Sequence, residues 1–198
     1  MKHILVMLIL VPLSLAAVEP RSDQGVAIFA GGCFWCTEAD FDKVSGVIST
    51  TSGYIGGEIQ RPSYEQVSRG GTGHLEAVRV VFDPEKTDYA KLLEAFWPTI
   101  DPLDAGGQFC DRGYHYRSAI FYTDSNQKNL AQASMKAVAE SVGLSGDIVT
   151  LILPAGEFWP AEEYHQNYAE RNPLRYNYYR SRCGRDQRLK EVWKHRAP

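Results

Sequence analysis

The 198-residue sequence has no internal repeat, no low-complexity tract, no long apolar run and only four cysteines. No apolar stretch reaches the roughly 18 residues of a typical membrane-spanning helix. The net charge of -3 argues against a broad basic surface of the kind that binds nucleic acid. The remaining composition, 44% hydrophobic and 23% charged, is that of an ordinary globular protein. We therefore expect one domain that buries a core without a disulfide scaffold.

The first 17 residues are typical of a secretory signal peptide. A short positive start precedes residues 4–15, which are apolar except for Ser14, and the small residues Ala16 and Ala17 follow. The alternative, a retained membrane anchor, is disfavoured because the apolar stretch is short and no cysteine follows the expected cleavage point to carry a lipid. We expect removal of residues 1–17 and export of a single domain of residues 18–198, to the periplasm in a double-membraned bacterium.

A cluster of arginines lies near the end of the chain. We interpret it as a solvated face that also carries aromatic packing residues, and a phosphate-binding surface is the alternative. Its members are Arg171, Arg175, Arg180, Arg182, Arg185 and Arg188.

Apolar periodicity and turn residues predict an irregular alternation of strands and helices. Strands are expected at residues 26–30, 47–54, 75–82, 118–122 and 148–153. Helices are expected at residues 33–44, 62–67, 88–97, 124–142 and 161–171. Asp124 and Gln127 resemble a capping box at the start of the fourth helix. This order predicts an α+β fold, a mixed sheet with packed helices.

The strongest chemical signal is the stretch GGCFWC at residues 31–36. The thiolate is the reactive form of cysteine, and a helix N-terminus favours negative charge. If the strand ends at the glycines, Cys33 begins the next helix and Cys36 follows one turn later on the same face. A sulfenic acid at Cys33 can then be captured by Cys36 as a disulfide. A zinc-bound pair is the alternative, but no second cysteine or histidine pair has suitable spacing, so we expect no metal.

Glu76 is a candidate general acid. On the strand at residues 75–82 it shares a face with Val78, Val80 and Phe82, because alternate side chains point to one side. A carboxyl group in apolar surroundings tends to keep its proton, which suits proton donation. The alternative places Glu76 at the solvated end of the strand, and the sequence does not decide between the two.

Other candidates are ambiguous from pattern alone. Phe34 and Trp35 fit either a pocket wall beside Cys33 or the core. Tyr64, Tyr116 and Asp111 lie in loop-like regions and resemble ordinary turn residues. His165 is interpreted as a helix histidine with its hydrogen bonds satisfied.

Several motifs in order resemble the peptide methionine sulfoxide reductase A family. They are GCFW (32–35), GYIGG (53–57), PSY (62–64), GHLEAV (73–78) and YRSAI (116–120), and the resemblance extends from about residue 26 to residue 193. It implies a ferredoxin-like core and reduction of S-methionine sulfoxide, both protein-bound and free, without a metal or organic cofactor. It also implies that an oxidised protein is a substrate and that a thioredoxin-type protein is the reductant.

The resemblance also implies roles for individual residues. Cys33 would attack the sulfoxide sulfur and become a sulfenic acid, and Glu76 would protonate the sulfoxide oxygen. The supporting tyrosines correspond to Tyr64 and Tyr116, and a supporting aspartate corresponds to Asp111. The pocket for the S-methyl group corresponds to Phe34 and Trp35.

The identity of the resolving cysteine stays open. Position 36 is more often glycine in the family, and the glycine-rich, cysteine-bearing tail of some members is missing. We favour Cys36, because only a local movement brings it to Cys33, with Cys183 as the alternative. Cys110 precedes Asp111 and is expected near the pocket without acting as the resolver.

Two other functions compete. A general thiol–disulfide oxidoreductase would use Cys33 and Cys36 but would give no role to Glu76 or to the two aromatic residues between the sulfurs. A non-enzymatic exported binding domain would hold two stable disulfides. Assays of insulin reduction and counts of free thiols discriminate these alternatives.

Overall fold

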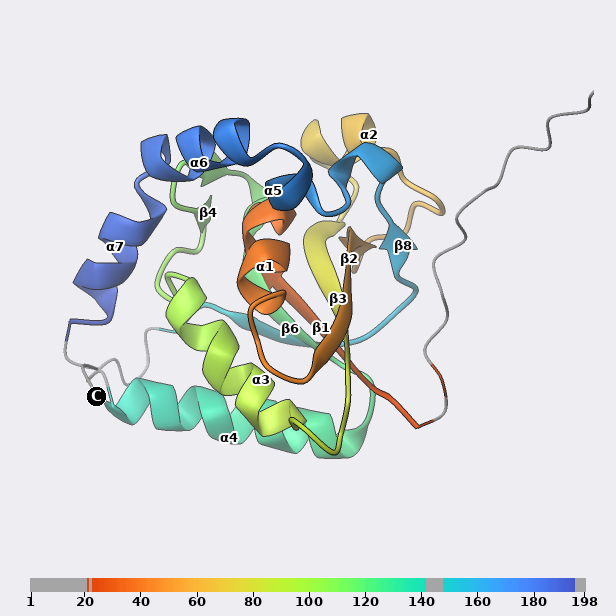
Figure 1. The fold of residues 1–198 in the computed structure, drawn as a ribbon, viewed down its shortest axis with the longest axis vertical. Coiled ribbons are helices and arrows are strands. Elements are labelled where there is room, and N and C mark those ends of the chain that lie inside the picture. The colour runs from red at the N-terminus through yellow and green to blue at the C-terminus, as the bar shows by residue number, and fades with distance from the viewer. Residues whose placement is uncertain (1–20, 22, 142–147, 195–198) are drawn as a thin grey trace, which may run out of the picture.

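The computed structural model describes residues 21, 23–141 and 148–194, so the predicted signal peptide lies outside the described residues. Six strands form one sheet in the order β7-β6-β1-β3-β2-β8 (Figure 1). They are β1 (Gly25–Gly31), β2 (Val47–Ile55), β3 (Leu75–Phe82), β6 (Ser118–Tyr122), β7 (Leu151–Pro154) and β8 (Trp159–Pro160). Two short strands, β4 (Gly107–Gln108) and β5 (Asp111–Arg112), pair separately.

The centre of the sheet has the ferredoxin-like order expected from the resemblance. The chain runs β1-α1-β2-β3-α3-β6, with α1 at Phe34–Phe41 and α3 at Tyr89–Phe96. The four strands lie in the order β6-β1-β3-β2, and every neighbouring pair is antiparallel. After β6, helix α4 (Ser125–Ser141) leads to β7, which pairs with β6 in parallel. The sheet is therefore mixed, and the predicted α+β class is confirmed.

Helices α1, α3 and α4 cover one face of the sheet (Figure 1). The main core lies between them and the sheet, where the Phe29 ring stacks on Phe41 and Phe96 at centroid distances of 4.8 and 4.9 Å. A smaller apolar cluster, which includes Ile28 and Phe121, lies on the opposite face. This double burial explains why β1 reads as a continuous apolar run instead of an alternating one.

The expected strands at 75–82 and 118–122 coincide with β3 and β6, while β7 begins three residues later than expected. The predicted cap of α4 is present in altered form. Asp124 accepts a hydrogen bond from the Gln127 N–H at 2.8 Å, but the Gln127 side chain accepts from Thr123 and donates to the Val26 carbonyl. Gln127 therefore ties the helix start to β1.

The helix expected at residues 161–171 is wrong. A 3₁₀ turn at Glu163–His165 and the short helix α5 (Tyr168–Arg171) are separated by Gln166 and Asn167, and Asn167 is left-handed with a φ of 51°. The Gln166 side-chain amide accepts from the Ser52 N–H and donates to the Ser52 carbonyl, both at 2.9 Å. These bonds to the edge of β2 replace the hydrogen bonds of a continuous helix.

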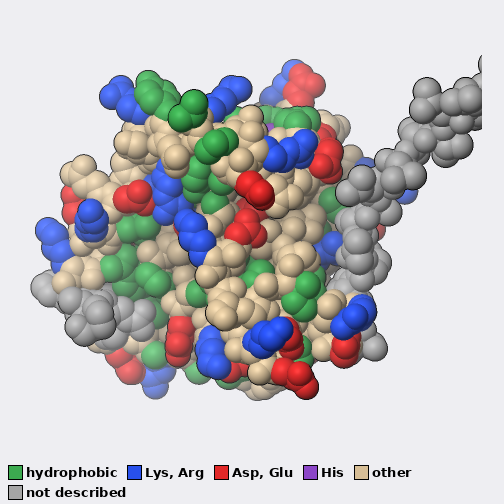
Figure 2. All heavy atoms as spheres, viewed as in Figure 1, with side chains coloured by type: hydrophobic (Ala, Val, Ile, Leu, Met, Phe, Trp, Pro, Cys, Tyr) green, Lys and Arg blue, Asp and Glu red, His purple; other side chains and the backbone are tan. Residues whose placement is uncertain are grey.

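The remaining helical elements are α2 (Tyr64–Ser68), α6 (Pro173–Arg182) and α7 (Arg185–Val192), with 3₁₀ turns at Trp97–Thr99 and Tyr114–Tyr116. None of the helices in the described part of the chain has the length and apolarity that crossing a membrane requires. Basic and acidic side chains are interspersed over the face shown in Figure 2.

The interpretation of the terminal arginines as a solvated face is wrong for two of them. Arg185 is only 1% exposed. Arg180 lies largely inside, with its guanidinium 2.9 Å from the carboxylates of Asp40 and Asp186. Arg180 turns inward where α6 lies against α1 and Tyr176 joins the buried cluster around Cys36. Arg185 turns inward because its guanidinium donates to the carbonyls of Gly31 and Thr99.

Candidate active site

A cavity of about 130 Å³ lies where β1, α1, β3 and the C-terminal helices meet. Seven of the residues singled out in the sequence line it: Cys33, Phe34, Trp35, Tyr64, Glu76, Asp111 and Tyr116. An eighth lining residue, Tyr179 of α6, was missed. The two candidate resolving residues, Cys36 and Cys183, are not among the lining residues.

Cys33 occupies the turn between β1 and α1, as the two glycines predicted. Gly32 has a φ of +85°, and a Cβ there would lie 2.6 Å from the Gln108 side chain, so only glycine fits. Cys33 is the N-cap residue of α1 and is 6% exposed. The next N–H, that of Phe34, donates to Glu76 Oε2 at 3.0 Å. The helix start thus brings the thiol and the carboxyl group to one place.

The buried thiols of Cys33 and Cys36 share a hydrogen bond. Burial raises the pKa of Cys33, and the bond to Cys36 and the nearby carboxyl groups raise it further. The same bond, donated by Cys33, is the largest factor that lowers the pKa of Cys36 to about 7. In the resting pair this hydrogen bond therefore favours the proton on Cys33 and the negative charge on Cys36. The helix terminus alone does not activate Cys33, because desolvation outweighs it.

Glu76 is buried, with 1% exposure, so the alternative of a solvated strand end is wrong. Burial raises the pKa of this carboxyl group to about 8, although the hydrogen bond from Phe34 opposes the shift. At neutral pH Glu76 consequently holds a proton that it can donate into the cavity.

Two tyrosines, Tyr64 and Tyr116, complete the polar side of the cavity. Glu162 holds the backbone at the first of them: its carboxylate accepts from the Tyr64 N–H at 2.8 Å and from the Tyr54 hydroxyl at 2.9 Å. Burial and the nearby Glu76 raise the pKa of the Tyr64 and Tyr116 hydroxyls, which therefore stay protonated. Both can donate hydrogen bonds to an oxygen atom in the cavity.

Two residues outside the cavity lining, Tyr168 and His165, support Trp35 in the apolar wall. The Trp35 indole stacks on the Tyr168 ring at a centroid distance of 3.7 Å, and its Nε1–H donates to His165 Nδ1 at 3.0 Å. The expectation that His165 is a helix residue is wrong, since it ends a 3₁₀ turn. Its position against Trp35 has no signal in the local sequence.

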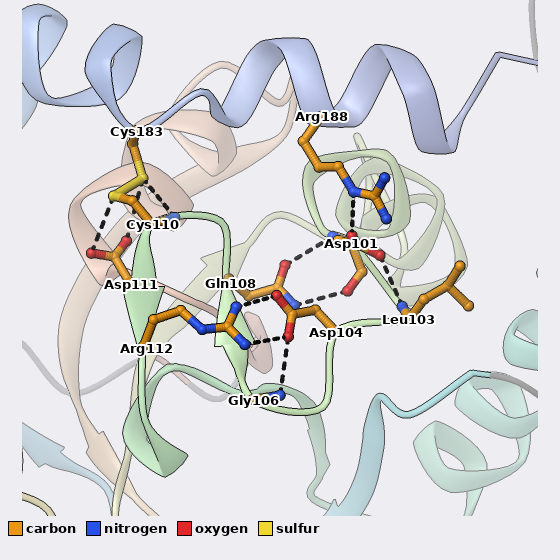
Figure 3. A network of polar contacts seen from close by, with 10 residues as sticks. All are labelled: Asp101, Leu103, Asp104, Gly106, Gln108, Cys110, Asp111, Arg112, Cys183 and Arg188. Atoms are coloured by element: carbon orange, nitrogen blue, oxygen red, sulfur yellow. Dashed lines mark hydrogen bonds and ion pairs between the residues drawn. A yellow bond between two sulfur atoms is a disulfide. The ribbon is translucent and has the colours of Figure 1, made fainter.

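Asp111 and Tyr179 form another part of the cavity wall, and the Tyr179 hydroxyl donates to the Asp111 carboxylate. Next to them a disulfide joins Cys110 to Cys183, the residue that ends α6 (Figure 3). Burial raises the pKa of Asp111, while the bond from Tyr179 opposes the shift. The disulfide thus fastens the loop of Asp111 to the helix of Tyr179.

A group of potential metal ligands lies at the same place. Cys110, Asp111 and Cys183 have ligand atoms within 4.8 Å of one another. Because the two sulfur atoms are bonded to each other, neither offers a thiolate to an ion.

Comparisons with known proteins agree with this geometry. The model of the family described as peptide methionine sulfoxide reductase matches residues 25–197. Peptide methionine sulfoxide reductase MsrA of Bacillus licheniformis is 50% identical over 168 residues, which are 85% of this chain and 93% of that protein.

Solved structures agree as well. Methionine sulfoxide reductase A of Corynebacterium diphtheriae is 33% identical with a TM-score of 0.72, covering 78% of this chain and 77% of that one. Mxr1 of Saccharomyces cerevisiae in complex with Trx2 is 20% identical with a TM-score of 0.55, covering 77% and 90%, a likeness that shows the fold alone.

Proposed function

The chain belongs to the peptide methionine sulfoxide reductase family, and from that premise we propose that Cys33 is its nucleophile and Glu76 its general acid. The enzyme reduces methionine sulfoxide by thiol chemistry. The observation that carries the assignment of roles is one cavity that holds the Cys33 thiol, a protonated carboxyl group and two protonated tyrosines. A sulfoxide needs these groups, because its oxygen leaves sulfur only after protonation.

Substrate binding follows from the two walls of the cavity. The S-methyl group packs against Phe34 and Trp35, while the sulfoxide oxygen accepts hydrogen bonds from Glu76, Tyr64 and Tyr116. A cavity of about 130 Å³ accepts only the end of a side chain, so the rest of a polypeptide stays outside. This fits a substrate that is either free or part of an oxidised protein.

In the first chemical step the proton of Cys33 passes to the hydrogen-bonded Cys36 thiolate. The Cys33 sulfur then attacks the sulfoxide sulfur while Glu76 gives its proton to the oxygen. The sulfur–oxygen bond of the substrate breaks and the oxygen moves, as a hydroxyl group, to the Cys33 sulfur, while the bond between the two sulfurs breaks and its electron pair returns to the methionine sulfur. The products are methionine, a sulfenic acid at Cys33 and an ionised Glu76.

In the second step Cys36 attacks the sulfenic sulfur of Cys33, a disulfide forms and the oxygen leaves as water. Cys36 is favoured as the resolving residue because it already contacts Cys33. Cys183 is bonded to Cys110, so it can resolve or relay only after that disulfide has opened.

A thioredoxin-type protein reduces the resulting disulfide by thiol exchange. Mxr1 of Saccharomyces cerevisiae, which in its reduced form is 27% identical to this chain, was also solved in complex with Trx2, and this motivates the choice of reductant. Cys33 and Cys36 are 6% and 1% exposed, so they must move outward or pass the disulfide to exposed cysteines before exchange. We propose the preference for the S epimer from the family resemblance alone.

Export of the enzyme is proposed from residues 1–17 alone, which have the pattern of a signal peptide. In a double-membraned bacterium this would place the enzyme in the periplasm.

The test uses Cys33→Ser and Cys36→Ser with each sulfoxide epimer. Cys33→Ser should lose reduction of the S epimer, and Cys36→Ser should complete one turnover and then stop with a thioredoxin-type donor. The double substitution Cys110→Ser with Cys183→Ser is the control, because it removes the two cysteines outside the Cys33–Cys36 pair. A folded Cys33→Ser enzyme that keeps more than about one per cent of turnover would contradict the assignment.

A further inference from the structure

Arg185, the first residue of α7, is buried beneath the turn that carries Cys33. Its side chain is 1% exposed. Nη2 donates to the Gly31 carbonyl at 3.1 Å and to the Thr99 carbonyl at 2.8 Å. The guanidinium also lies over the Phe109 ring, with Cζ 4.5 Å from the ring centroid. These contacts fix the end of β1 from below.

The same guanidinium touches the space behind the nucleophile. A Cβ built on Gly32 would lie 3.7 Å from Arg185 Nη1. The glycine before Cys33 therefore keeps room for the cation as well as for Gln108. A displacement of Arg185 would shift the residue next to the thiol.

The charge of Arg185 has no carboxylate partner among the described residues, since none forms an ion pair with it within 4 Å. Two arginines close to it in the sequence do have carboxylate partners. Arg180 pairs with Asp40 and Asp186. Arg188 pairs with Asp101, as Figure 3 shows. Arg185 Nε also makes no hydrogen bond. Because burial of an unpaired arginine cation is costly, the site is expected to supply the compensating anion.

The thiol pair, on the turn that Arg185 holds through the Gly31 carbonyl, is the candidate for this anion. After the hydrogen bond with Cys33, the positive charge of Arg185 is a further factor that lowers the pKa of Cys36, and it opposes the burial that raises the pKa of Asp111. Asp111 already accepts a hydrogen bond from Tyr179.

We propose that Arg185 is a positioning residue of the redox site, whose buried guanidinium fixes the turn of Cys33 and supplies the positive charge that holds the Cys33–Cys36 pair as a monoanion. The inference rests on the proposed function of this pair. It gives the C-terminal helix a part in the reaction, because a cation beneath the turn of Cys33 favours the thiolate that takes the Cys33 proton.

Other groups also face the pair and must be considered in any titration. The acidic ones are Glu76 of β3, Asp111 of β5 and Asp40 of α1. The others are Tyr64 of α2, Tyr116 of the 3₁₀ turn, and Tyr176, Tyr179 and Arg180 of α6.

The experiment is a pH titration of thiolate absorbance in the fully reduced enzyme. The double variant Cys33→Ala with Cys36→Ala serves as the reference, so that tyrosines and the other two thiols cancel. The wild-type difference should show one thiolate with a midpoint near 7. If no thiolate forms until the pH exceeds about 8.5, which is the pKa of an ordinary thiol, the proposal is overturned before any arginine variant is made.

Three variants then test the cation. Arg185→Met should move the midpoint upward by about one unit, the lower end of the effect of one nearby opposite charge. Arg185→Lys keeps the charge and should keep the midpoint, while losing some single-turnover rate because the turn is held less firmly. Arg182→Met removes a charge from an exposed position on α6 and should change neither.

An unchanged midpoint in folded Arg185→Met, or an equal shift in Arg185→Lys, overturns the proposal. The titration contains no sulfoxide, so failure of the proposed catalytic roles would appear in turnover and not in this measurement.

Discussion

The substitution Glu76→Gln should stabilise the enzyme while slowing it. The carboxyl group has a pKa of about 8 in the folded state, against an ordinary value of 4.5. Between these values the folded protein keeps the proton and the unfolded chain releases it. Stability therefore falls as pH rises through this window and is level above it. One pKa unit corresponds to about 1.4 kcal/mol, so the whole window is worth about 5 kcal/mol.

Glutamine has nearly the same shape and can still accept the Phe34 N–H, but it does not titrate. The free energy of unfolding of Glu76→Gln, minus that of the wild type, should increase by about 3 kcal/mol between about pH 5 and pH 7.5. Urea unfolding at closely spaced pH values measures this difference. Other buried acids cancel because both proteins contain them.

The kinetic counterpart is a slower chemical step. Loss of a general acid typically lowers the rate by about 10²–10⁴-fold, which single-turnover reduction of the S epimer measures. In the wild type the same rate should fall as pH rises through about 8, where Glu76 loses its proton. Glu94→Gln, on the exposed side of α3, is the matched control and should alter neither quantity. A stability difference that stays flat from about pH 5 to pH 8 would refute the argument that Glu76 is held protonated.

Three further outcomes are expected. The double variant Cys110→Ala with Cys183→Ala should lose about 2–4 kcal/mol of stability in urea unfolding, because the disulfide closes a long loop; equal stability of variant and oxidised wild type would contradict this. Tyr179→Phe removes the donor to Asp111 and should raise the KM for sulfoxide roughly tenfold with less effect on single-turnover rate, and an unchanged KM would show that this wall does not bind substrate. Export by a double-membraned bacterium should yield a periplasmic chain that begins near Ala17 or Val18, and N-terminal sequencing that finds Met1 would contradict the signal peptide.

Local signals were sufficient where a few neighbouring residues determine the backbone. Gly31 and Gly32 predicted a strand end followed by a helix start, and this turn places Cys33 at the N-cap of α1. The alternation along residues 75–82 predicted that Glu76 shares a face with Val78, and both are buried. In these segments the local preference and the tertiary packing favour the same structure.

Local signals failed where a side chain bonds to a distant backbone. The helix expected at 161–171 is interrupted because Gln166 bonds to Ser52, which is 114 residues away. The pairing of Cys110 with Cys183 spans 73 residues, and spacing alone does not select one partner among four cysteines. Arg185 looked like a surface residue because its neighbours on the chain are polar, whereas its contacts are Gly31 and Thr99.

The residues that were missed or misinterpreted share an origin. Tyr179 and Arg185 belong to the C-terminal helices, and His165 belongs to the segment that leads into them. The β1–α1 turn and β3 supply the thiol and the acid, while the C-terminal segment supplies one wall of the cavity, the support of Trp35 and the buried cation. The chemistry therefore requires this segment to stay docked on the sheet domain. The disulfide at Cys183 and the hydrogen bond from Tyr179 to Asp111 both join this segment to the loop that lines the cavity.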